Sequence, residues 1–265
     1  MDDKLSIYEL MIEVTRRCNI VCDHCLRGEL QNLDVKNEDI TTLLSNFSDI
    51  GQIVLTGGEP SLNLSAIKHF ISEIKRQDIS LGSFYMATNA KIVKPEFLTV
   101  LMELYSICED KEMCQVDVSN DYYHSLQEAG DINNSGRQML EVFRFTGKKY
   151  EEESYNYRNQ FGGSAINEGY YAENFGDGRE LTPDAIEVEG NKVDSCGGGQ
   201  FYMNAQGEIV SCCDLSYTSQ KNKVEFQVCN VNSPDYLKEI EAYNERVEEW
   251  NENGYITKKE LKKVA

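Results

Sequence analysis

The chain has 265 residues, which is enough for one full-sized domain and a smaller second unit. Hydrophobic residues make up 40% of it and aromatic residues 10%, so an ordinary buried core can form. Its 45 acidic and 26 basic residues give a formal net charge of −19, which argues against a nucleic-acid-binding surface because phosphate contacts need clustered Lys and Arg.

The N-terminus and the cysteine content point to a reducing compartment. The first residues, Met1-Asp-Asp-Lys4, lack the basic and apolar regions of a secretion signal. No apolar run approaches the ~18 residues that a membrane span requires. We therefore expect a cytoplasmic protein without a membrane partner, in which nine cysteines serve as metal ligands or catalytic groups rather than disulfides.

Strand and helix patterns alternate at least three times over the first 120 residues. The expected strands are Leu10–Val14, Gln52–Leu55, Ser83–Met86 and Cys114–Val118. The expected helices are one capped by Asn37 with Ile40, Leu43, Leu44 and Phe47 on one face, one with Ile67, Phe70, Ile71 and Ile74, and one that Pro95 opens. This alternation predicts βα units and a parallel sheet, with the polar motifs in the loops that follow the strands.

The pattern loosens after about residue 147, and the composition changes near 184–194. We therefore divide the chain into a core of residues 1–185 and an extension of residues 186–265. In the extension, residues 201–210 predict a β-hairpin with its turn near Ala205–Gly207. An acidic helix follows, and it carries an apolar stripe that we expect to pack on the core: Leu237, Ile240, Tyr243, Val247 and Trp250.

Three cysteines follow the first strand with the spacing Cys18-x3-Cys22-x2-Cys25. Iron–sulfur clusters take thiolate ligands, and three thiolates on a [4Fe–4S] cube leave one iron open for a substrate or cofactor. A structural zinc ion would need a fourth ligand, for which His24 between two cysteines is poorly placed. On this chemistry alone, three interpretations of the cysteines remain: ligands of a cluster, ligands of a zinc ion, or unbound thiols.

The segment from Thr15 to Arg27 resembles the cluster loop of radical S-adenosylmethionine (SAM) enzymes. The resemblance implies that Cys18, Cys22 and Cys25 bind a [4Fe–4S] cluster and that the methionyl group of SAM chelates the open iron. His24 stands where the family usually has an aromatic ring near the cofactor. The fold implied is a partial (β/α)6 TIM-like barrel of the α/β class, with a small C-terminal β-hairpin and helix as a cluster-binding extension.

Further motifs support the resemblance. Gly57-Gly58-Glu59-Pro60, after the second strand, is similar to the motif that holds the SAM amine, and its glycines would let the backbone approach a ligand. Thr88-Asn89 resembles a Thr-Asn-Gly segment, with Ala90 in place of the glycine. Ser119 ends the fourth strand, where family members place groups that contact SAM. The segment 166–173 resembles a later motif that packs on adenine, although its spacing departs from the family pattern.

The extension contains a second group of cysteines, Cys196, Cys212, Cys213 and Cys229. A hairpin between the first two would bring them together. The segment looks like the SPASM extension in its shorter twitch form, which implies an auxiliary [4Fe–4S] cluster held by Cys196, Cys212 or Cys213, and Cys229. A further close pair of cysteines that twitch domains usually show is missing, so a degenerate extension without a cluster stays open.

The resemblance implies an enzyme that reductively cleaves SAM to a 5′-deoxyadenosyl radical and abstracts hydrogen from its substrate. We expect a peptide-modifying maturase that forms a thioether, a carbon–carbon crosslink or an epimerised residue. The alternatives are a small-molecule dehydrogenase or epimerase, a glycyl-radical enzyme activase and, from another class, a zinc-binding protein. The implied partners are the substrate and an electron donor such as flavodoxin or ferredoxin. The sequence does not identify a catalytic acid or base.

Overall fold

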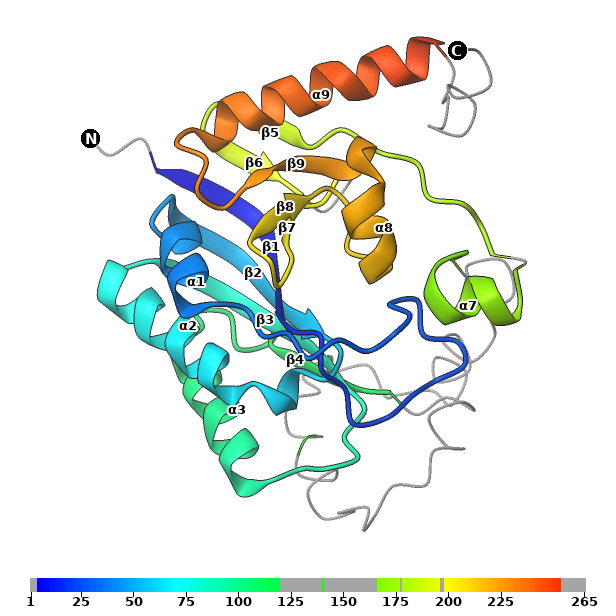
Figure 1. Ribbon diagram of the computed structural model, residues 1–265. Helices are drawn as coiled ribbons and strands as arrows, with labels where there is room; N and C mark the ends of the chain where they lie inside the picture. The colour runs from blue at the N-terminus through cyan, green and yellow to red at the C-terminus, as the bar shows by residue number, and fades with distance from the viewer. Residues whose placement is uncertain (1–3, 120–139, 141–165, 177, 196–197, 254–265) are drawn as a thin grey trace.

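The computed structural model describes residues 4–119, 140, 166–176, 178–195 and 198–253. In its first part, strands and helices alternate as the sequence predicts (Figure 1). The strands are β1 (Leu5–Thr15), β2 (Phe47–Gly57), β3 (Ser80–Thr88) and β4 (Gln115–Val118). The helices are α1 (Asn37–Leu44), α2 (Leu64–Gln77) and α3 (Pro95–Ile107), with a short 3-10 helix η1 (Pro60–Leu62) before α2.

Strands β1 to β4 are parallel neighbours, as expected for strands joined through helices. The three helices cover one face of the sheet (Figure 1), and aromatic side chains fill the layer between them: Phe47, Phe70, Phe84 and Phe97. The predicted α/β class with a parallel sheet is therefore confirmed. The remaining units of the predicted (β/α)6 pattern would fall on residues 120–165, most of which lie outside the described residues.

The structure corrects two details around α1. Asn37 is the first residue of the helix rather than its N-cap, because Lys36 is the residue that keeps an extended backbone there. Phe47 does not share the helix face: the helix ends at Leu44, and Asn46 donates a hydrogen bond from its side chain to the Thr42 carbonyl at 2.9 Å. Phe47 then begins β2, where it is still buried in the same core.

The C-terminal part adds short strands and three helices. The strands are β5 (Glu187–Glu189), β6 (Lys192–Asp194), β7 (Tyr202–Met203), β8 (Glu208–Val210) and β9 (Gln227–Asn230). The helices are α7 (Gly169–Asn174), α8 (Tyr217–Asn222) and α9 (Tyr236–Asn253), with a 3-10 turn η3 (Val224–Phe226) before β9. The predicted hairpin is confirmed: β7 and β8 are antiparallel, and Gly207 in their turn has a positive φ of 78°.

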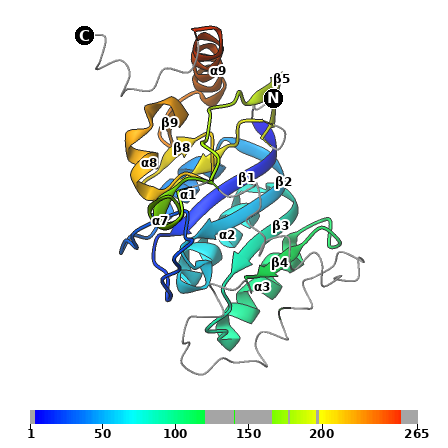
Figure 2. The ribbon, with the colours of Figure 1, turned by 90° about the vertical axis from the view of Figure 1, so that its right-hand side faces the viewer.

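These C-terminal strands join the same sheet. Both β6 and β7 pair with β1 in parallel, so the strand order is β4-β3-β2-β1-β7-β8-β9, with β5 attached to β6. Figure 2 shows β8 and β9 on the side of β1 away from β2. Since β4 and β9 are the ends of this order, the described sheet is open rather than a closed barrel. The division at residues 185 and 186 stays a prediction.

Helix α9 packs on the core through the stripe that the sequence predicts. Ile240, Tyr243 and Val247 are buried, and the Tyr243 hydroxyl donates to the Ser211 hydroxyl at 2.6 Å. Leu237 and Trp250 are partly buried against the same core. Among the described residues, no helix is both long and apolar enough to cross a membrane.

Replacing Ile240 by Ala is expected to lower the free energy of unfolding by about 2–5 kcal/mol, because a fully buried side chain would leave a cavity under α9. Glu241→Ala, at the exposed neighbouring position, is the control and should change it by less than about 0.5 kcal/mol. Chemical denaturation of both variants provides the comparison. Equal effects would contradict the packing of α9 on the core.

Candidate functional site

A cavity of about 750 Å³ lies at the carboxyl ends of the parallel strands, where α/β proteins place their ligands. It brings together most of the predicted site residues, which come from four separate segments of the chain. They are Cys18, Cys22, His24, Cys25, Gly57, Gly58, Glu59, Thr88, Asn89 and Ser119. Pro60 is buried behind this wall as the first residue of η1.

The three cysteines of the loop after β1 line this cavity together. Cys22 is buried, whereas Cys18 and Cys25 are partly exposed, and the Cys25 amide donates to the Cys22 carbonyl at 3.0 Å. The Asn89 side-chain amide, from the end of β3, lies 3.6 Å from the Cys18 sulfur. Burial raises the pKa of Cys18 to about 11, so this thiol must lose a proton when it binds a metal.

The three cysteines provide a donor set without a fourth protein ligand. Among the described residues, no three His, Cys, Asp or Glu side chains converge on one point in this structure. Three thiolates that line one cavity are the ligand type of a [4Fe–4S] cube with one open iron, whereas a structural zinc ion takes four protein ligands. The donor set therefore fits the chemistry of a cluster with one open iron.

Helix α7 supports the cysteine loop from outside. Gly169, its first residue, has a φ of +53°, and a Cβ there would lie 2.4–2.6 Å from backbone atoms of Cys25, Leu26 and Gly28. The next residue, Tyr170, donates its amide to the Cys25 carbonyl at 2.8 Å. The segment 166–173 thus packs on the cysteine loop in this structure, which is a different contact from the one that its resemblance to the adenine motif implies.

The two glycines at the end of β2 allow a close approach of the chain to itself. A Cβ on Gly57 would lie 2.1 Å from the Thr15 carbonyl oxygen, and one on Gly58 would lie 2.3 Å from that of Arg17. Gly57 also has a φ of +147°, which side chains rarely adopt. The glycines therefore hold the end of β2 against the residues that lead into Cys18.

The Glu59 carboxylate is only 2% exposed and is engaged by donors of its own chain. Its Oε1 accepts from the Ser61 amide and hydroxyl and from the Thr88 hydroxyl, the last at 2.7 Å. Its Oε2 accepts from the Asn89 amide at 2.8 Å. These contacts make the carboxylate a link between the ends of β2 and β3, and Glu59 also lines the cavity. That it receives the SAM amine stays a prediction.

The segment after β3 contains a positive φ angle at a residue that is not glycine. Ala90, which replaces the glycine of the resembled motif, has a φ of +48°, and its amide donates to the Thr88 hydroxyl at 3.0 Å. Asn89 is thereby aimed at the cysteine loop, where its side chain also donates to Asn19 at 2.8 Å. Ser119 lies next to this segment, because its amide donates to the Thr88 carbonyl at 2.8 Å.

The C-terminal cysteines are not all brought together. Cys212 and Cys213 pack on the cavity side of the sheet, and Cys213 lines the cavity; burial raises their pKa values to about 11 and about 12. Cys229 pairs with Ile209 in the sheet and packs on the core side, beside α9. Cys196 lies outside the described residues. A cluster held jointly by Cys229 and Cys212 or Cys213 does not fit this arrangement.

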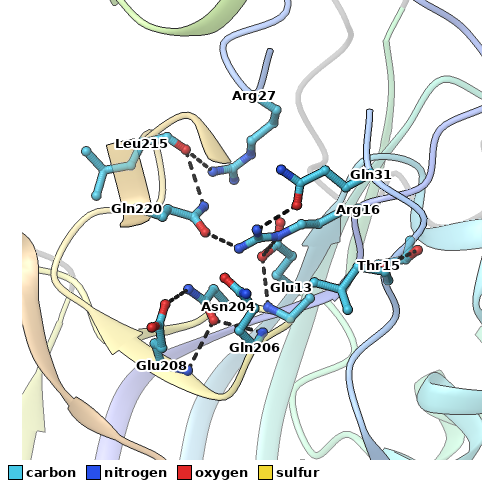
Figure 3. A network of polar contacts seen from close by, with 12 residues as sticks. Glu13, Thr15, Arg16, Arg27, Gln31, Asn204, Gln206, Glu208, Leu215 and Gln220 are labelled. Atoms are coloured by element: carbon cyan, nitrogen blue, oxygen red, sulfur yellow. Dashed lines mark hydrogen bonds and ion pairs between the residues drawn. The ribbon is translucent and has the colours of Figure 1, made fainter. Parts of the chain in front are cut away.

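A buried polar network behind the cavity escaped the sequence analysis (Figure 3). Arg16, just before the cysteine loop, is bonded to the Glu13 carboxylate at 3.2 Å and to Gln220 of α8 at 2.6 Å. Arg27, two residues after Cys25, lines the cavity and donates to the Leu215 carbonyl at 2.8 Å. Arginines that flank the cysteine triplet are the signal that could have drawn attention to both residues.

Gly169→Ala is expected to disturb the cysteine loop, because its Cβ would collide with backbone rather than with a movable side chain. Gly190→Ala is a matched control: it also has a positive φ, of +64°, but no atom lies within 4 Å of its Cβ position. Both variants should lose about 1 kcal/mol to backbone strain. Only Gly169→Ala should also lose most of the iron bound after anaerobic reconstitution, and equal iron in the two variants would contradict this role.

Comparisons with known proteins agree with this site. Residues 11–140 match the model of a family described as a 4Fe-4S single cluster domain. Among solved structures, native anSMEcpe with bound AdoMet and Cp18Cys peptide is similar at 13% identity and a TM-score of 0.54, over 91% of this chain and 82% of that one. Streptococcus suis SuiB bound to precursor peptide SuiA is similar at 14% identity and a TM-score of 0.44, over 79% and 60%. No curated protein matches the chain.

The likeness to the first of these structures shows a shared fold, and the family match coincides with the segment that carries the cysteine triplet. In that fold, the structure places the triplet and the Gly-Gly-Glu segment around one cavity at the strand ends. The comparisons therefore show that the chain has the fold of that structure and that residues 11–140 match a 4Fe-4S single cluster domain.

Proposed function

We propose that this chain is a radical SAM enzyme that modifies a peptide, with Cys18, Cys22 and Cys25 as the ligands of its [4Fe–4S] cluster. The observation that carries the proposal is the single cavity that the three thiols share with the ends of β2, β3 and β4. Its volume of about 750 Å³ lies in the upper part of the range of ligand pockets, roughly 300–1,000 Å³, which suits a cofactor together with a substrate side chain.

When bound, the cluster and SAM supply a 5′-deoxyadenosyl radical that abstracts a hydrogen atom from the substrate. The residues of the chain hold these groups and shield them from water. We assign SAM to the wall of the cavity formed by Gly57, Gly58, Asn89 and Ser119, with His24 beside it. Glu59 and Thr88 act as positioning residues, since their mutual hydrogen bond fixes the backbone that carries Asn89.

The cavity is also lined by polar and apolar side chains that can contact a substrate. Met11 and Val54 form an apolar floor that keeps water away from a reactive intermediate. Glu9 and Tyr85 line the same space, and burial raises the pKa of the Glu9 carboxyl. Two observations favour a peptide as the occupant. The start of α8 and the residues before it complete the wall through Cys213, Asp214 and Tyr217. One structure of this fold is described with a bound peptide.

No step is assigned to a second cluster, because the described cysteines of the extension do not form one ligand set. We expect about four irons per chain after anaerobic reconstitution. A content near eight would contradict this assignment and would require ligands that include Cys196. The chain has nine cysteines, and those in the described residues form no disulfide, which further favours a reducing cytoplasm as the place of action.

Changing Cys18, Cys22 and Cys25 together to Ala should abolish iron binding and the formation of 5′-deoxyadenosine from SAM under dithionite, because no thiolate remains to hold the cube. The fold should persist, since α1 to α3 pack on the far face of the sheet. Cys229→Ala, on the core side of β9, is the control and should keep both iron and SAM cleavage. SAM cleavage by the triple variant would refute the ligand assignment.

The substrate class is tested by co-expressing the enzyme with short peptides encoded beside its gene and measuring their masses. A modified peptide whose hydrogen appears in 5′-deoxyadenosine, traced with a deuterated peptide, would support the proposal. Deuterium transfer only from a sugar or alcohol, or a glycyl radical on a partner protein, would overturn it in favour of the dehydrogenase or the activase.

A further inference from the structure

A cluster of buried polar groups lies where the cysteine loop meets the C-terminal hairpin and α8. Tyr202 and Tyr217 are 0% and 3% exposed, and among the described residues neither hydroxyl has a hydrogen-bond partner. Buried polar groups are nearly always paired, so two unpartnered hydroxyls in one region, each able to donate a hydrogen bond, point to an acceptor that the chain itself does not supply.

This group of buried residues borders the cavity, together with the neighbouring Arg27. Tyr217 and Arg27 both line it, and Arg27 lies over the ring of Tyr202 with its guanidinium carbon 5.4 Å from the ring centre. Among the described residues, Arg27 has one hydrogen-bond acceptor, the Leu215 carbonyl at 2.8 Å. A guanidinium has five N–H donors in a planar fork, so donors remain for a second partner. Burial raises the pKa of Tyr217, which keeps its hydroxyl protonated and able to donate.

Among the described residues, Arg27 forms no ion pair, and the carboxylate that acts on its charge, that of Glu13, is already engaged. Glu13 is neutralised by Arg16, whose guanidinium is also held by Gln31 and Gln220. Glu168 is paired with Lys223 at 2.6 Å. Asp214 lines the cavity too, but it lies beside the thiol of Cys213, with 3.6 Å between sulfur and Oδ1. A partly buried cation with an uncompensated charge is costly, and an anion brought by a ligand would relieve that cost.

We propose that Arg27 and the hydroxyl of Tyr217 bind a carboxylate of the substrate, with the ring of Tyr202 supporting the guanidinium. The inference rests on the proposed function and deepens it, because it assigns the substrate an acidic side chain or a free C-terminus near the reacting position. The carboxylate of SAM has the same chemistry, and the experiment below distinguishes the two sources.

The probe is ¹³C-acetate, titrated by NMR into the cluster-loaded enzyme with saturating SAM, and acetamide is its neutral analogue. Acetate should bind while SAM is present, and acetamide should not bind measurably. Arg27→Gln should weaken acetate binding at least about tenfold, which corresponds to the loss of one charge-assisted contact. Tyr217→Phe should weaken it less, by roughly threefold to tenfold, because a neutral donor is lost.

Arg246→Gln is the matched control. Arg246 also donates to a backbone carbonyl, that of Gln227 at 2.9 Å, and also lies over a tyrosine ring, that of Tyr243 at 5.6 Å, but it is on α9 away from the cavity. This variant should bind acetate like the wild type. Arg27→Lys, which keeps the charge, should retain part of the affinity and covers the case in which Arg27→Gln fails to fold.

Acetate that binds only when SAM is absent would overturn the inference, because Arg27 would then hold the carboxylate of SAM. No acetate binding, or equal binding by wild type and Arg27→Gln, would also overturn it. These failures are separate from that of the proposed function. An enzyme that forms 5′-deoxyadenosine from SAM but does not bind acetate contradicts only the role of Arg27, whereas one that cannot cleave SAM contradicts the proposed function.

Discussion

The buried ion pair between Glu13 and Arg16 joins the N-terminal and C-terminal parts of this chain. Glu13 is fully buried near the end of β1, and its Oε2 accepts both from Arg16 and from the Ala205 amide in the hairpin turn. Arg16 reaches onward to Gln31 behind the cysteine loop and to Gln220 in α8. Removing one partner of such a pair typically costs about 3–5 kcal/mol, because the other charge stays buried. The position of the cysteine loop against the extension depends on this contact.

A second buried carboxylate connects two of the strand ends that border the cavity. Glu59 gathers the Ser61 hydroxyl, the Thr88 hydroxyl and the Asn89 amide, and thereby fixes the ends of β2 and β3 to each other. Both carboxylates connect segments that are distant in the chain: Glu13 links β1 to the hairpin turn, and Glu59 links β2 to β3. The walls of the cavity are thus preorganised by buried charges before any ligand binds.

The sequence predicts the layers of this fold well, because parallel strands and amphipathic helices leave periodic patterns. It also predicts that the cysteines and Gly57–Glu59 meet, since loops after parallel strands share one edge. It could not predict that Cys229 faces away from Cys213, because a register shift in β9 decides which face each residue takes. Nor could it show that Gly57 lies against Thr15, since that contact joins distant segments.

The described residues of the extension contribute walls and charges to the cavity. Tyr217 donates its amide to the Arg27 carbonyl, and α7 holds the loop at Cys25, so C-terminal elements on both sides shape the segment that follows the cysteines. A loop held from two sides keeps its thiols in place through contacts of the chain alone. The same part of the chain also fixes an arginine at the cavity wall, because the Leu215 carbonyl, just before α8, accepts from the Arg27 guanidinium.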